Sequence, residues 1–148
     1  MKTLNCGDMF NSKIFHWNCC YFVYLIFWNV THNNSAFFSI PHARIYCHTV
    51  EIDHMFTTYL SRAKDIINLD LTGCQNLSML AFLLHTNLIE ILLLCNCDNL
   101  VDSEFDAIAS CQNLKYLNLA FTRISTISVK KVTSQLPRLT TLDVAGMV

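Results

Sequence analysis

The chain has 148 residues, which is enough for one small domain with a sizeable hydrophobic core. Its 10 basic and 11 acidic residues give a formal net charge of −1 at pH 7 and a pI near 6.6. Electrostatic binding to nucleic acid needs a clustered basic surface, and the pair Lys130-Lys131 is too small to provide one. We therefore expect no nucleic-acid partner.

Residues 1–40 are rich in aromatic side chains and contain only Lys2, Asp8 and Lys13 as charged groups. The apolar run Cys19–Trp28 is ten residues long, which is short of the roughly 20 residues that span a bilayer as a helix. We expect no membrane-spanning helix here. We place a domain boundary near Pro41, so that residues 1–40 form a separate N-terminal segment ahead of a domain at 41–148.

Three interpretations of residues 1–40 stay open. An export signal fits the two lysines and the apolar run, and Asn29–Thr31 and Asn33–Ser35 match the glycosylation acceptor pattern, but the small-residue cleavage site is poor. A cap would cover the open end of a repeat array, which otherwise exposes an apolar face. The third interpretation is a poorly ordered extension.

The next part of the chain contains a degenerate repeat. Cys47 in the segment Pro41–Cys47 precedes Leu71 by about one period of the repeat that follows. His54–Ala63 then reads as a helix, because its apolar residues recur at helical spacing.

Four strand-like segments share the spacing apolar-x-x-apolar-x-apolar: Ile66–Leu71, Ile89–Leu94, Leu114–Leu119 and Leu139–Val144. The nearly constant interval between them lies within the roughly 20 to 29 residues of a leucine-rich repeat. Amphipathic stretches at 102–111 and 127–136 are predicted helices, and the first has an acidic N-terminal turn. The pattern predicts an α/β fold: a short leucine-rich-repeat solenoid of roughly three to five repeats, with parallel strands on the concave face and helices on the convex face.

A cysteine or threonine follows three predicted strands at the same distance. Cys74, Cys97 and Thr122 each lie three residues past the last strand leucine. In such a solenoid this position points inward, where the side chain can bond backbone groups freed as the strand turns away.

The residues that most closely match a known family are Cys97–Asp102, Phe105, Ile108-Ala109, Cys111 and the strand that begins at Leu114. This repeat resembles the cysteine-containing leucine-rich repeats of F-box substrate receptors. The segment Leu136–Gly146 is also similar to the repeats of Zyg-11-type receptors.

The resemblance implies a protein–protein interaction module with no chemistry of its own, which is the substrate-recognition part of a cullin-RING (SCF-type) ubiquitin ligase receptor. The expected partners are a protein or peptide ligand and ubiquitin-ligase subunits. We recognise no F-box or elongin-binding box, and the chain stops directly after a strand, so we expect the repeat domain to be truncated. The alternative is a secreted or membrane-tethered leucine-rich-repeat binding protein with an N-terminal export signal.

The eight cysteines bear on the cellular compartment. The repeat already accounts for Cys74, Cys97 and Cys111, because buried cysteines act as small hydrophobes with a weak donor. We therefore favour reduced thiols and a cytoplasmic or nuclear location, whereas disulfides and glycosylation would indicate secretion.

No residue pattern predicts a cofactor, a metal site or a catalytic site. His42, Cys47, His48 and His54 lie close in sequence but lack the paired short spacings of a zinc finger. The chain has three glycines and no phosphate-binding loop or nucleophile elbow. We interpret it as a non-enzyme.

The strand pleat locates the candidate binding residues. With the fourth and sixth positions of each segment in the core, the intervening side chains line the concave face, and we predict that the ligand contacts Asp70, Ile91, Leu93, Cys95, Tyr116, Asn118 and Asp143. The row at Ile91, Leu93 and Cys95 is apolar, although a register with Leu88 in the template also fits. An exposed apolar row indicates a partner, whereas the aromatic N-terminal segment could instead cover it.

Overall fold

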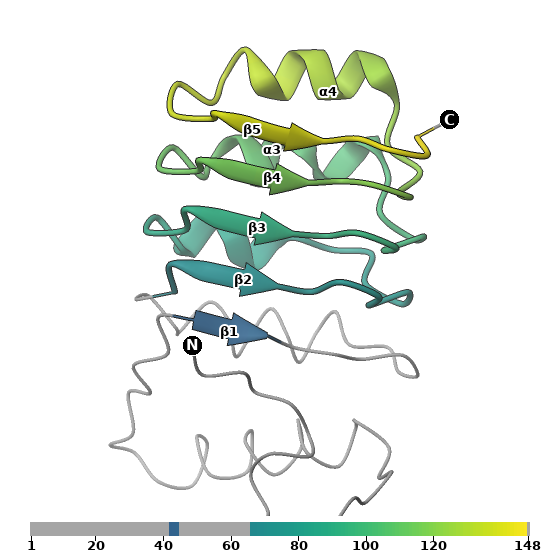
Figure 1. Ribbon diagram of the computed structural model, residues 1–148, viewed down its shortest axis with the longest axis horizontal. Coiled ribbons are helices and arrows are strands. Elements are labelled where there is room, and N and C mark those ends of the chain that lie inside the picture. Colours follow the sequence, from purple (N-terminus) through teal and green to yellow (C-terminus); the bar gives the residue numbers. More distant parts are fainter. Residues whose placement is uncertain (1–41, 45–65, 148) are drawn as a thin grey trace, which may run out of the picture.

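The computed structural model describes residues 42–44 and 66–147. The described strands are β1 (His42–Arg44), β2 (Asn68–Asp70), β3 (Ile91–Leu93), β4 (Tyr116–Asn118) and β5 (Thr141–Asp143). They form one parallel sheet in chain order, each strand paired with the next (Figure 1). The predicted α/β class with a parallel sheet is therefore confirmed. Residues 1–40 and the predicted helix at His54–Ala63 lie outside the described residues.

Helical segments connect the strands from β2 onward. They are η1 (Ala81–His85), η2 (Asp102–Glu104), α3 (Phe105–Ala109) and α4 (Thr126–Thr133), where η denotes a 3₁₀ helix. α3 contacts both η1 and α4 and lies behind the sheet in Figure 1. Each connection thus returns the chain to start the next strand beside the last one. None of the helices in residues 66–147 has the length and hydropathy needed to span a bilayer.

The register of the sheet follows the predicted spacing from β2 onward. The central strand residues that pair in succession are Leu69, Leu92, Leu117 and Leu142, which are the fourth positions of the four predicted segments. The pairing of β1 with β2 differs from the prediction. Ala43 pairs with Leu69, so the earlier strand exists, but this register does not make Cys47 the equivalent of Leu71. A single cysteine was a poor guide to register because the segment lacks the repeated leucines.

Both predicted helices are shorter than their amphipathic stretches. The stretch at 102–111 starts as the 3₁₀ turn η2 and ends as the five-residue α3. The helix predicted at 127–136 ends at Thr133, and Pro137 follows closely; a proline disfavours helical backbone in the residue before it. Ser125 begins α4 by accepting a hydrogen bond from the Ser128 N–H at 3.3 Å.

One face of the sheet packs against the helical segments to form the core. Leu69, Leu92 and Leu117 occupy the central position of β2, β3 and β4 and are completely buried. The helical side contributes buried residues such as Phe82, Phe105, Ile108, Val129 and Val132. The central residue of β5, Leu142, is only half-buried against this core. The side chains between the core leucines point to the other face, which we call the open face.

The turn after each of the last four strands contains a residue with left-handed backbone. It lies three residues beyond the strand's last residue in every case, at Gly73 (φ 79°), Asn96 (φ 58°), Phe121 (φ 56°) and Gly146 (φ 66°). Glycine takes this conformation without steric cost and asparagine tolerates it. Phenylalanine is the exception in the series, because bulky side chains rarely adopt it.

Candidate protein-interaction face

Six of the seven predicted binding residues lie on two straight rows of the open face. The first strand positions form the row Asn68, Ile91, Tyr116 and Thr141, and the third positions form the row Asp70, Leu93, Asn118 and Asp143. The seventh residue, Cys95, follows β3 and is half-buried like the other six. The structure thus brings the whole predicted set together on one surface.

The two registers considered for β3 are distinguished by burial. Ile89, Leu92 and Leu94 are completely buried, whereas Leu88 is 46% exposed. The register with Leu92 and Leu94 in the core is therefore confirmed, and Ile91 and Leu93 belong to the open face. Neighbouring strands lie about 4.8 Å apart, so these two apolar side chains have polar neighbours within one strand spacing on either side, Asn68 and Asp70 in β2 and Tyr116 and Asn118 in β4.

The polar residues in the row of third strand positions also stabilise the turns after their strands, a role that the sequence analysis did not predict. Asp70 accepts a hydrogen bond from the Thr72 N–H at 3.0 Å, Asn118 from the Ala120 N–H at 2.9 Å, and Asp143 from the Ala145 N–H at 3.1 Å. Each side chain thereby shapes the turn that leaves its strand. Leu93 cannot make this bond. A signal was present in the sequence, since Asp or Asn recurs at this position in three of the four segments.

In the row of third strand positions, the carboxylates of Asp70 and Asp143 lie on either side of the apolar Leu93. Burial raises the pKa of the Cys95 thiol, and the carboxylates of Asp143 and Asp70 raise it further. Asn118 links β4 to β5, because its Nδ2 donates to Asp143 Oδ2 at 3.4 Å.

Phe121 is a surface residue that the sequence interpretation did not select. Its side chain is 54% exposed, and its N–H donates to the Ala145 carbonyl at 2.8 Å. A Cβ on Gly146 would lie 2.4 Å from ring atoms Cδ1 and Cε1 of Phe121, so the ring packs directly over that glycine. The sequence signal for Phe121 was its place in the series with Gly73 and Gly146, where a bulky residue is unexpected.

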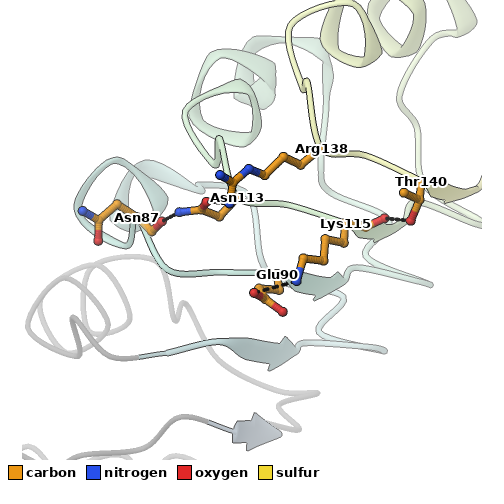
Figure 2. A network of polar contacts seen from close by, with 6 residues as sticks. All are labelled: Asn87, Glu90, Asn113, Lys115, Arg138 and Thr140. Carbon is orange, nitrogen blue, oxygen red and sulfur yellow. Dashed lines mark hydrogen bonds and ion pairs between the residues drawn. The ribbon is translucent and has the colours of Figure 1, made fainter.

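At the N-terminal ends of the strands, polar groups from successive connections bond to one another (Figure 2). Lys115 Nζ lies 2.8 Å from Glu90 Oε1, and the Thr140 hydroxyl donates to the Lys115 carbonyl at 3.0 Å. Asn113 donates to the Asn87 carbonyl at 2.8 Å and accepts from Arg138 Nη1 at 2.7 Å. These groups tie successive connections together, so we do not assign them to a binding site.

The predicted inward position after the strands is confirmed. Cys74, Cys97 and Thr122 are 1%, 0% and 3% exposed. The Cys97 thiol donates to the Leu71 carbonyl at 3.3 Å, and the Thr122 hydroxyl donates to the Leu119 carbonyl at 2.7 Å. The Cys97 and Thr122 side chains thus satisfy backbone groups at the strand exits.

The buried thiols are protonated at neutral pH. Burial raises the pKa of Cys97 to about 12 and the pKa of Cys111 to about 11, and a neutral thiol is a weak nucleophile and a weak metal ligand. Cys74, Cys95, Cys97 and Cys111 are all free thiols. Within residues 66–147, no three side chains of His, Cys, Asp or Glu come together as metal ligands would.

No protein-family model matches the chain, and a comparison with curated proteins also gives no match.

Proposed function

We propose that the chain is a leucine-rich-repeat module that binds a protein or peptide on the open face of its sheet. The observation that carries the proposal is the half-buried pair Ile91 and Leu93 on a regular sheet whose other face is closed by the core. Apolar surface surrounded by polar groups is typical of the centre of a protein interface. In this proposal the open face is the concave side of a solenoid and the helical segments form its convex side.

The same proposal makes the module the substrate-recognition part of a ubiquitin-ligase receptor. Its support is the repeat from Cys97 to Leu114, in which Cys97 and Cys111 are buried, as the resemblance to F-box receptors implies. The four cysteines within residues 66–147 are free thiols, which suits the cytoplasm or nucleus, where cysteines stay reduced. In this proposal the module has no catalytic role of its own.

The test is affinity purification of the tagged full chain from cells, followed by mass spectrometry. We expect cullin-ligase subunits and a set of further proteins with the native chain, and loss of those further proteins with Leu93→Asp. Leu84→Asp is the matched control, because Leu84 is 58% exposed on η1 and we expect it to retain the same partners.

Thermal melting of both variants separates a partner site from a surface that the chain itself covers. If the open face is free for partners, Leu93→Asp should lower the free energy of unfolding only slightly. If the chain itself covers Leu93, the substitution would bury a carboxylate and lower the free energy of unfolding by several kcal/mol. Equal recovery of all partners by the native chain and Leu93→Asp would refute binding on the open face. Recovery of a glycosylated, secreted species alone would refute the ligase role and favour the export alternative.

A further inference from the structure

The corner of the sheet where β4 and β5 end combines an anion, Asp143, with an exposed aromatic residue, Phe121. Asp143 and Phe121 are both anchored on Ala145: the Asp143 carboxylate accepts from the Ala145 N–H at 3.1 Å, and the Phe121 N–H donates to the Ala145 carbonyl at 2.8 Å. A negative group on β5 and an aromatic residue from the turn after β4 are therefore both held next to Ala145. A cation is the partner that both groups attract.

The charge of Asp143 is not neutralised by the described residues around it. Within residues 66–147 the ion pairs are Glu90–Lys115 and Asp106–Lys131, and the hydrogen bonds of the Asp143 carboxylate are with the Ala145 N–H and the Asn118 amide. Asp143 as a residue is half-buried, and its bond to Ala145 is exposed, so the carboxylate is accessible to a ligand. We leave Asp70 out of the site, because Arg44 is its register neighbour in β1.

Phe121 also holds an unfavourable backbone conformation at this corner. Left-handed backbone costs an L-residue with a bulky side chain about 1–2 kcal/mol, and the equivalent turns use Gly73, Asn96 and Gly146. Such conformations are often found at binding sites. The exposed ring makes no contribution to the core that would offset the cost.

We propose that this corner, formed by Asp143, Phe121 and the neighbouring Leu93 row, binds an arginine or lysine side chain of an extended partner peptide whose apolar residue lies on Leu93. This rests on the proposed function and names its ligand class. Leu93 and Asp143 are separated by two strand spacings, or about 10 Å, and an extended peptide rises about 3.3 Å per residue. The basic and apolar residues of the ligand are therefore two to four positions apart.

The test is selection of a phage-displayed library of random 12-residue peptides on the tagged full chain. We expect enrichment of arginine or lysine two to four positions from a large apolar residue. Asp143→Asn keeps the turn, because Asn118 makes the same bond in the preceding turn, and should weaken a selected peptide about fivefold. Asp143→Lys should select acidic peptides instead. Asp106→Lys is the control with the same charge change on α3, and should leave the basic preference intact.

The outcomes separate this inference from the proposed function. Selected peptides that require Leu93 but show no basic preference, or that bind Asp143→Asn and Asp143→Lys equally well, would overturn the cation site and leave the open face as a binding surface. If Leu93→Asp binds the peptides as well as the native chain, or the native chain selects none, both proposals fail.

Discussion

At the scale of single residues, the turns after the last four strands show which residue types the left-handed position accepts. The same place is occupied by Gly73, Asn96, Phe121 and Gly146. Gly146 is required twice over, by its left-handed backbone and by the ring of Phe121, which leaves no room for a Cβ. Phe121 is the residue least suited to this backbone, and its side chain lies largely in solvent.

Phe121→Gly should therefore raise the stability of the chain while weakening the proposed ligand site. We expect a gain of up to about 1 kcal/mol in the free energy of unfolding, because glycine removes the left-handed strain. Urea denaturation followed by circular dichroism measures it. Asn96→Gly is the control, with an expected change of a few tenths of a kcal/mol, since asparagine already tolerates the conformation. A loss of stability in Phe121→Gly would mean that the ring contributes more by packing than its backbone costs.

At the scale of elements, short helical segments are held by side chains that reach to neighbouring connections. Glu104 Oε2 accepts from the Leu80 N–H at 2.7 Å, and Asp102 Oδ1 accepts from the Ser125 N–H at 2.8 Å. Each bond joins positions one repeat apart in the sequence. The acidic turn of η2, which the sequence indicates only as the start of a helix, thus stabilises the connections before and after it.

The tie between Asp102 and Ser125 predicts a pH dependence of stability. The hydrogen bond from the Ser125 backbone, together with its hydroxyl, holds the pKa of Asp102 below its usual value. Because the folded pKa is depressed, the stabilisation is present above the unfolded pKa, near 4, and is lost as the pH falls through the folded pKa. In denaturation experiments between pH 7 and pH 3, Asp102→Asn should lose less stability on acidification than the native chain.

The control for this experiment is Asp98→Asn, which removes an exposed carboxylate in the connection before η2 and leaves the bond between Asp102 and Ser125 in place. If Asp102→Asn and the native chain have parallel profiles, the tie does not depend on the charge of the carboxylate.

The sequence predicted most of the sheet, and the reasons for the errors are physical. Leucines such as Leu92 and Leu117 identify the strands because they recur at a nearly constant interval in the sequence and each is buried at the centre of its strand. β1 was misaligned because its segment lacks those leucines. The open-face residues could be predicted from strand alternation. The sequence marks Phe121 only as a bulky residue in line with Gly73 and Gly146, because its backbone angle and its contact with Gly146 are visible only in the structure.

At the scale of the whole described region, burial decreases toward β5. The three core positions of the β4 segment, Leu114, Leu117 and Leu119, are completely buried. Their equivalents in the β5 segment are Leu139 and Leu142, which are half-buried, and Val144, which is 38% exposed. The apolar area that a leucine removes from water therefore depends on the strand in which it lies.

Matched substitutions measure this difference. Leu117→Ala should destabilise the chain by about 3 kcal/mol, as is typical for a buried leucine, and Leu142→Ala by about 1 kcal/mol, because its side chain is only partly removed from water. Equilibrium denaturation of the full chain gives both values. Equal losses would show that β5 is covered in solution as completely as β4.

The pairing of the strands in chain order has a consequence for biosynthesis. Every described pair joins a strand to the one that follows it in the chain, so no strand has to wait for a distant partner. Each pairing needs only the strand before it and the connection between the two, and domains fold from the N-terminal side while they are being translated. We therefore expect the nascent polypeptide to extend its sheet by one strand with each further repeat that leaves the ribosome.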